Sequence, residues 1–387
     1  MDFAELGAWL RLAMTPGIGP LTARRLLAQQ GLPQALFTPG QGTPPEGLSA
    51  AQARALATPP EGWQAQLERT WAWLQEAPAG TRRAVWTLGD PAYPAALLDI
   101  PDPPLMLYAT GRLDLPLHSA HSLAMVGSRN PTPQGAVNAR QLARALADRG
   151  VTIVSGLALG VDGAAHQGAL DSPASADGLA TVAVVGTGLD RVYPRQHHAL
   201  AHAIAQHGWV LSEYPLGTPP LAANFPRRNR LIAGLAQATL VVEAALHSGS
   251  LITARLAAEQ GKEVFALPGS IHAPQSRGCH ALIREGAMLV ESAQDVLDAL
   301  PGLSHPPAPT TADGMAPAGA AAQNPSRADP EDPALLQALG YDPVDLDTLQ
   351  ARTGLPTPRL QARLMALELD GQVVRLPGGL FQRMALA

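Results

Sequence analysis

Short apolar runs that alternate with helical patterns along the middle of the chain restrict its fold more than any other feature. These runs cover residues 122–126, 151–154, 181–185, 209–211, 239–242, 263–267 and 288–290. Strands that are separated by helical segments of roughly 10–25 residues are typical of a doubly wound parallel sheet. The sequence therefore predicts an α/β fold with an extended, Rossmann-like sheet in residues 111–300.

Small residues follow several of these runs directly. Gly127-Ser128-Arg129 follows the first run, Ser155-Gly156 the second and Gly186-Thr187-Gly188 the third. The carboxyl ends of parallel strands meet at one edge of the sheet, and ligands bind at that edge in folds of this kind. A Gly/Ser turn before a helix also presents backbone N–H groups, which favour a phosphate. We therefore expect a phosphate-bearing ligand at this edge.

The stretch 224–253 combines charge, an aromatic ring and another small-residue turn. Three arginines, Arg227, Arg228 and Arg230, follow Phe225, and the turn Ser248-Gly249-Ser250 follows the next apolar run. Guanidinium groups bind phosphates through two parallel hydrogen bonds, and an aromatic ring can stack on a base. This combination indicates a ligand with phosphates and bases. A surface arginine cluster beside an ordinary strand–helix loop is the alternative, and both interpretations stay open at this point.

Charge and cysteine content limit the possible functions. The 387 residues include 27 basic and 32 acidic side chains, a net charge of −5, so any nucleic-acid site must be local. The single cysteine, Cys279, excludes a disulfide framework or a zinc cluster within the chain. No apolar run reaches the length of a membrane span. We expect a soluble, cytoplasmic protein that makes no contact with a membrane and holds no metal.

Different patterns flank the sheet region. Residues 1–110 read as a small helical domain, in which Gly17-Ile18-Gly19 separates two helical stretches, 4–14 and 21–30. Such a helix-hairpin-helix lets backbone amides approach a phosphate, although a plain αα-hairpin with a glycine turn gives the same pattern. Residues 301–333 contain eight prolines and no periodicity, which predicts a flexible linker.

The C-terminal residues 334–387 read as a winged helix. Helices are expected at 346–353 and 357–370, and a hairpin follows at 373–383. The second helix carries Arg359 and Arg363 but also Glu368 and Asp370. This balance of charge is poor for tight DNA binding, so a protein-contact role is at least as well supported.

Signals for catalysis are weak throughout. No phosphate-binding loop of the G-x-x-x-x-G-K-[ST] type is present, and Gly186-Thr187-Gly188 lacks the third glycine of a dinucleotide site. Asp162 and His166 are spaced to share a metal or a proton, but a capping Asp and a packed His explain them more simply. Glu243 could act as a general base, or it could have a structural role beside the turn. We predict no catalytic residue and no cofactor.

Seven motifs lie in order between residues 120 and 295. They are Val126-Gly127-Ser128-Arg129, Ser155-Gly156-Leu157-Ala158 with Gly160-Val161-Asp162 and Ala165-His166, Gly186-Thr187-Gly188-Leu189-Asp190 with Tyr193-Pro194, Ser212-Glu213-Tyr214-Pro215, Phe225-Pro226 with Arg228-Asn229-Arg230 and Ile232-Ala233-Gly234, Ser248-Gly249-Ser250-Leu251-Ile252-Thr253-Ala254, and Pro268-Gly269-Ser270. In these motifs the sequence resembles the DprA/Smf family of DNA-processing proteins of natural transformation. The helical and winged-helix regions fit that family's usual layout.

The resemblance implies a single-stranded DNA-binding protein that needs no ATP and is not an enzyme. It would protect incoming DNA and help a RecA-type recombinase to load past single-strand-binding protein. It would also form a homodimer, for which the segment 279–290 is our choice of contact. The DNA-binding residues that the motifs and the resemblance together suggest are Gly127, Ser128, Arg129, Ser155, Gly156, Arg195, Phe225, Arg228, Asn229, Arg230, Ser248, Gly249 and Ser250.

Two positions depart from the family pattern. Asparagine is usual where His197 stands, and some relatives carry a basic residue where Ala222 stands. The alanine at 222 would weaken phosphate contact beside Phe225.

The rival class of function is an enzyme, because the fold also resembles nucleotide N-glycosidases that bind a nucleoside monophosphate. Those enzymes carry a Pro-Gly-Gly-x-Gly-Thr stretch, and the corresponding residues here, 247–254, lack it.

Overall fold

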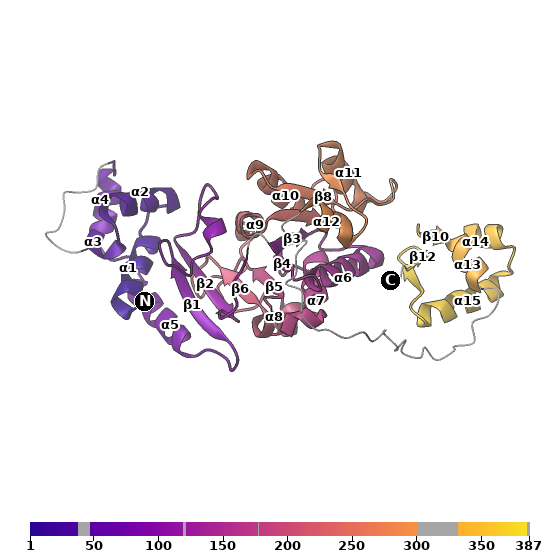
Figure 1. The fold of residues 1–387 in the computed structure, drawn as a ribbon, viewed down its shortest axis with the longest axis horizontal. Helices are drawn as coiled ribbons and strands as arrows, with labels where there is room; N and C mark the ends of the chain where they lie inside the picture. The colour runs from indigo at the N-terminus through magenta and orange to yellow at the C-terminus, as the bar shows by residue number, and fades with distance from the viewer. Residues whose placement is uncertain (38–46, 119–120, 177, 301–331, 385–387) are drawn as a thin grey trace, which may run out of the picture. The chain divides into compact units, whose positions relative to one another are not determined.

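The computed structural model of the chain describes residues 1–37, 47–118, 121–176, 178–300 and 332–384. It separates into two compact units, which Figure 1 draws from the N-terminus in indigo to the C-terminus in yellow. The first unit contains almost all of the described residues up to 300, and the second contains the C-terminal ones. Among these described residues, no helix combines the length and the apolar character that crossing a membrane requires.

A nine-stranded sheet forms the centre of the first unit, in the order β1-β2-β6-β5-β4-β3-β7-β8-β9. Its parallel strands are β3 (Ser122–Val126), β4 (Thr152–Ser155), β5 (Thr181–Val184), β6 (Trp209–Ser212), β7 (Ala238–Val241), β8 (Glu263–Ala266) and β9 (Met288–Leu289). Each coincides with one of the apolar runs in the sequence. The predicted α/β fold class is therefore confirmed.

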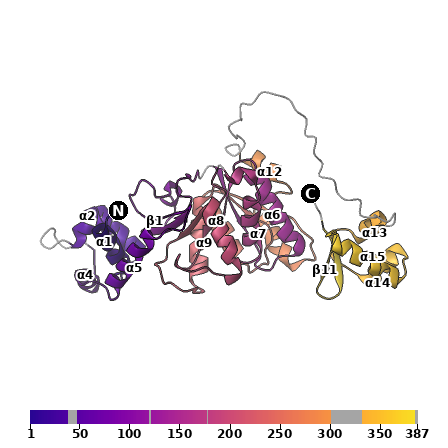
Figure 2. The same cartoon turned by 90° about the horizontal axis from the view of Figure 1, so that it is seen from below.

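Helices cover both faces of this sheet (Figure 2). One face packs on α9 (Asn224–Leu235), α10 (Ser250–Glu259) and α11 (Arg277–Arg284). The other packs on α6 (Pro133–Ala147), α7 (Val161–Leu170), α8 (His198–His207) and α12 (Ala293–Ala299). Because both faces are covered, β3 to β8 are almost completely buried and mostly apolar, which is why the sequence pattern is so clear.

An N-terminal group of helices precedes the sheet. It consists of α1 (Phe3–Met14), α2 (Pro20–Gln30), α3 (Pro33–Phe37), α4 (Ala50–Ala57) and α5 (Trp63–Gln75). Two further strands, β1 (Arg82–Thr87) and β2 (Met106–Gly111), pair antiparallel, and β2 also pairs antiparallel with β6. The sequence pattern did not predict these two strands. The boundary that we placed at residue 110 falls within β2.

The helices and the added strands share one core. Leu6 and Trp9 of α1 belong to the same buried cluster as Tyr108 of β2 and Leu216, which follows β6. In the helix-hairpin-helix region, Arg24 and Arg25 donate hydrogen bonds to the backbone carbonyls of Pro101 and Gly47. The two arginines that add charge to this motif are thus used to hold the chain together.

The second unit has its own core and a three-stranded sheet of order β10-β12-β11. Its elements are α13 (Asp332–Leu339), β10 (Val344–Asp345), α14 (Leu346–Thr353), α15 (Thr357–Leu369), β11 (Val373–Leu376) and β12 (Leu380–Arg383). This is the predicted winged helix. Residues 301–331, which make up most of the predicted linker, lie outside the described residues.

Candidate nucleic-acid interface

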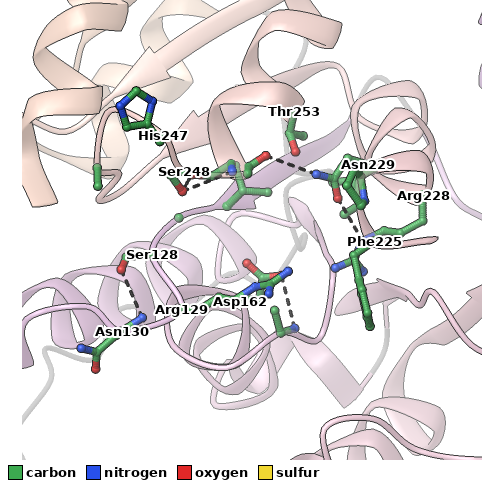
Figure 3. A pocket seen from close by; sticks show the side chains of 18 residues that line it. Ser128, Arg129, Asn130, Asp162, Phe225, Arg228, Asn229, His247, Ser248 and Thr253 are labelled. Carbon is green, nitrogen blue, oxygen red and sulfur yellow. Dashed lines mark hydrogen bonds between the residues drawn. The ribbon is translucent and has the colours of Figure 1, made fainter. Parts of the chain in front are cut away.

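A pocket of about 470 Å³ opens at the carboxyl edge of the sheet (Figure 3). Four segments line it: the turn after β3, the segment between β4 and the start of α7, the first part of α9, and the turn between β7 and α10. The lining residues are Val126, Gly127, Ser128, Arg129, Asn130, Ala158, Asp162, Phe225, Pro226, Arg228, Asn229, Ile232, Ala245, His247, Ser248, Gly249, Ser250 and Thr253. The sheet thus brings together segments that lie more than a hundred residues apart in the sequence.

The pocket lies where the order of strands changes direction. From β3 the chain builds β4, β5 and β6 on one side, and then returns to add β7 on the other side of β3. The turns after β3 and β7 consequently diverge and leave a crevice, the usual ligand position in such sheets. The amide of Ser128 donates to the carbonyl of Glu243 at 2.7 Å, which ties the two turns together.

Arg228 forms part of the floor of this pocket rather than its rim. Only 3% of the residue is exposed, and its Nη1 donates to the backbone carbonyls of Gly156 and Val184. Its Nε donates to Oδ1 of Asn229 at 3.0 Å. Burial lowers the pKa of Arg228 to about 10, although the charge of Asp162 opposes this shift. Arg228 remains a cation at neutral pH, and it joins the ends of β4 and β5.

The Ser155-Gly156 turn is filled by the chain itself. The carboxylate of Asp162 accepts hydrogen bonds from the amides of Gly156 at 3.1 Å and Ala158 at 3.3 Å. The hydroxyl of Ser155 is fully buried and donates to the carbonyl of Met125 at 2.6 Å. Burial raises the pKa of Asp162 above its ordinary value, while Arg228 opposes that shift. The amides that we expected to meet a phosphate therefore already hold an internal carboxylate.

The turn before α10 is arranged differently. The hydroxyls of Ser248 and Ser250 hydrogen-bond each other at 2.6 Å, and all of Ser248-Gly249-Ser250 lines the pocket. The side-chain amide of Asn229 donates to the carbonyl of Gly249 at 3.3 Å and so joins α9 to this turn. The positive end of the α10 dipole lies at this point, which favours a negatively charged group in the pocket.

An aromatic and cationic cluster borders the pocket. The guanidinium carbon of Arg129 lies 5.7 Å from the centroid of the half-buried Phe225 ring. The ring of Tyr193 lies on Phe225 as well, with centroids 5.5 Å apart and planes inclined by 39°. A cation and two aromatic rings thus lie together at this border.

Four of the expected site residues, Ser155, Gly156, Arg195 and Arg230, do not line this pocket. Arg230 forms ion pairs with Asp102 at 2.8 Å and with Glu213 at 2.6 Å, and it is almost completely buried. Arg195 lies at the start of a short 3-10 helix, Arg195–His197, and is exposed to solvent. Ser155 is buried beneath the pocket. The amide of Gly156, in the turn after β4, donates to Asp162. Whether any of the four contacts DNA stays a prediction.

The histidine and carboxylate pairings considered from sequence resolve into structural contacts. The fully buried His166 lies with Nδ1 2.7 Å from Thr181 Oγ1, and that hydroxyl donates its own proton to the carbonyl of Ile153. His166 must therefore carry its proton on Nδ1, and burial lowers its pKa to about 3. Among the described residues no cluster of three or more His, Cys, Asp or Glu side chains could hold a metal.

Several residues of the pocket were not among the expected DNA-binding residues. Asn130, Asp162, His247 and Thr253 line it, and Tyr193 contacts its aromatic border. Tyr193 and Asp162 both lie in motifs quoted above, so the sequence held a signal for them. What it did not hold was the packing that brings Tyr193 onto Phe225, 32 residues further along the chain.

Comparison with known proteins decides the family. A family model described as DNA recombination-mediator protein A matches residues 84–301, and one described as DprA winged helix domain matches residues 319–379. The chain belongs to the DNA recombination-mediator protein A (DprA) family. The resemblance seen in the seven sequence motifs is thereby confirmed.

Relatives of the DprA family match over long stretches. Protein Smf of Escherichia coli (strain K12) is 44% identical over 294 residues, which is 74% of this chain and 74% of that protein. DprA of Streptococcus pneumoniae is 48% identical over 208 residues, or 54% of this chain and 71% of that protein. The X-ray structure of the Streptococcus pneumoniae protein covers 77% of this chain and 98% of its own, with a TM-score of 0.58 and 34% identity.

A second solved DprA structure concerns DNA directly. The structure of DNA processing protein A from Helicobacter pylori, described as giving insight into its single-stranded DNA binding mode, has a TM-score of 0.51 and 34% identity. It covers 58% of this chain and 97% of its own.

Proposed function

We propose that this chain binds single-stranded DNA in the pocket at the carboxyl edge of its sheet. The observation that carries the proposal is the partly exposed Phe225 ring beside Arg129 at the border of a pocket that also contains the Ser248-Gly249-Ser250 turn. A ring can stack on any base, and arginine and helix-end amides can bind the phosphates of any sequence. The single-stranded DNA binding of the Helicobacter pylori relative supports the same interpretation.

A titration of labelled oligonucleotides tests this function. We expect the full chain to bind a single-stranded oligonucleotide more tightly than the matching duplex, with an affinity that falls as salt rises. Phe225→Ala should weaken binding by about 1–3 kcal/mol and leave the salt dependence unchanged, because a base face carries no charge. Fluorescence anisotropy at two salt concentrations measures both effects. Equal affinity for single strand and duplex would contradict the proposal.

The same preparations also test the enzyme alternative. A nucleotide N-glycosidase would release free base from nucleoside monophosphates, whereas a DNA-binding protein would leave them intact. Chromatography of such mixtures after incubation separates the two outcomes. Release of base that Phe225→Ala abolishes would replace our proposal with the enzyme.

We further propose that the bound DNA is protected and passed to a RecA-type recombinase without ATP consumption by this chain, in the cytoplasm. DNA strand exchange by a RecA-type protein in the presence of single-strand-binding protein is the suitable assay. The chain should shorten the lag before exchange, and Phe225→Ala should not. An unchanged lag with the wild-type chain would exclude the recombinase role while leaving DNA binding intact.

A homodimer through the outer edge of the sheet completes the proposal. Met288 and Leu289 of the edge strand β9 are 43% and 45% exposed, which is unusual for apolar side chains on a strand. Leu282 and Ile283 of α11 are partly buried beside them. Light scattering should give the mass of two chains, and Leu289→Lys should return it to one.

A further inference from the structure

A second, smaller cavity of about 110 Å³ adjoins Tyr193, away from the Arg129 pocket. Apolar side chains form most of its wall, including Leu157, Val185, Ala201 and Val210, which belong to one small buried cluster. Arg83, Arg191 and Gln206 supply polar groups to the same cavity. An apolar cavity with a few polar groups is the usual form of a site for a flat organic ring.

Tyr193 connects this cavity to the Arg129 pocket. The residue is 46% exposed, it lines the smaller cavity, and its ring lies 5.5 Å from Phe225, which lines the larger pocket. The two rings therefore stand between the two cavities. A strand whose base stacks on Phe225 meets Tyr193 next.

The polar groups of the smaller cavity are suited to a nucleotide. Arg83 donates from Nη1 to the carbonyl of Trp73 at 2.8 Å, which fixes the position of its guanidinium. Arg191 is held loosely at the surface by Asp190 at 3.2 Å, and its side chain is 39% exposed. A fixed cation inside and an adjustable one at the surface can accompany a base and its phosphate.

We propose that Tyr193 and the cavity beside it form a second base-binding position, which receives the nucleotide next to the one on Phe225. This inference rests on the proposed DNA-binding function and specifies how many bases the site holds. The occupant is a neighbouring nucleotide of the same strand, because Tyr193 of the smaller cavity packs on Phe225 of the larger pocket. Stacking on aromatic rings does not depend on sequence, so this position should accept any base.

Two variants of the full chain address the position separately. Tyr193→Ala removes the ring, and Ala205→Phe fills the cavity from α8 while leaving Tyr193 in place. Tyr341→Ala, which changes an exposed tyrosine of the winged-helix unit, is the matched control. Thermal melting of each variant shows that the fold is retained.

Thymidine monophosphate and oligothymidylates of two to eight nucleotides supply the test. For the longer ligands, Tyr193→Ala and Ala205→Phe should each lower the affinity about 5- to 150-fold, the range for one stacked base, while Tyr341→Ala has no effect. For thymidine monophosphate the Phe225→Ala effect should persist, and the Tyr193→Ala effect should shrink to less than about twofold, because one base cannot occupy both positions.

Each outcome decides one proposal. If the wild-type chain binds none of these ligands, the DNA-binding function itself is wrong. If it binds them, and Tyr193→Ala and Ala205→Phe match the control, the second position alone is wrong. Equal loss at every ligand length in Tyr193→Ala would also overturn it, because Tyr193 would then only hold Phe225 in place.

Discussion

Two serine–glycine turns at the same edge of the sheet differ in what occupies them. After β4, the amides of Gly156 and Ala158 are occupied by Asp162, and the guanidinium of Arg228 lies against the turn. After β7, Ser248, Gly249 and Ser250 face the pocket, and the two hydroxyls bond each other. A turn of this composition can therefore serve as an internal brace or as a ligand site.

The difference comes from what the following helix supplies. Asp162 is the second residue of α7, and its carboxylate accepts from the amides of Gly156 and Ala158 in the preceding turn, in the way that a ligand phosphate would. α10 has no acidic residue in its first turn. An internal anion thus occupies the first turn, whereas α10 supplies no acidic residue to the second turn, which we propose binds an external anion.

The largest expected loss of stability comes from replacing Arg228, which holds the turn after β4 in place. Arg228→Ala leaves Asp162 buried without its nearest cation and two carbonyls without their donor, which should lower the free energy of unfolding by about 3–5 kcal/mol. Chemical denaturation measures this loss, and Arg227→Ala, an exposed neighbour on α9, is the control. A fully stable Arg228→Ala protein whose DNA binding has lost about 0.7 in salt slope would instead make Arg228 a phosphate ligand.

Acid should weaken the same region through His166. The pKa of His166 is about 3 in the folded chain because of burial, against 6.5 for an ordinary histidine, so the unfolded chain binds the extra proton. Stability from this group is complete above pH 6.5 and is lost as pH falls towards 3, by about 2 kcal/mol at pH 5.

Denaturation at pH 8 and pH 5 measures that loss. His166→Gln can keep a hydrogen bond to Thr181 but cannot gain a proton, so its stability should change less between the two pH values. An identical pH dependence in the two proteins would show that His166 is not the group that titrates.

Adding one methyl group to each turn compares them directly. A Cβ at Gly156 would lie 2.2 Å from Nη2 of Arg228, so Gly156→Ala must displace the guanidinium and should cost about 1–3 kcal/mol. A Cβ at Gly249 would meet nothing within 4 Å, and the φ of −62° suits alanine, so Gly249→Ala should stay within about 0.5 kcal/mol. Equal melting temperatures for the two variants would show that the two turns tolerate an added methyl group equally well.

The smallest expected effect concerns Arg129 at the rim. Arg129→Ala should leave stability unchanged and reduce the salt slope of single-stranded DNA binding by about 0.7, the value for one phosphate contact. Arg149→Ala, at an exposed position after α6, should leave the slope unchanged. A slope unaltered in Arg129→Ala would move the phosphate contact to another residue of the pocket.

Sequence could predict the parallel strands because burial on both faces makes each one a plain apolar run. It could not predict β1 and β2, since β1 begins with Arg82 and Arg83 and β2 pairs with β6, about a hundred residues away. The two strands were recognisable only by their partners.

Side-chain roles on α9 show what the sequence did contain. Arg228 shares a helix face with the buried Leu231, Ile232 and Leu235, at spacings of three, four and seven residues. That pattern indicates that Arg228 is buried and distinguishes it from the exposed Arg227. The occupation of the Gly156 turn by Asp162 depends on where α7 begins, which local sequence fixes poorly.

The antiparallel pair β1–β2 determines where this chain can be cut. The pocket is lined only by residues from 126 onwards, so residues 120–300 look like a sufficient fragment. Cutting there would strip β2 from β6, expose a bare strand edge to other chains, and uncover Leu211 and Trp209 on a sheet face. The smallest portion that can be handled as a molecule of its own therefore includes β1, β2 and the helices that pack on them, although none of the described residues before 126 lines the pocket.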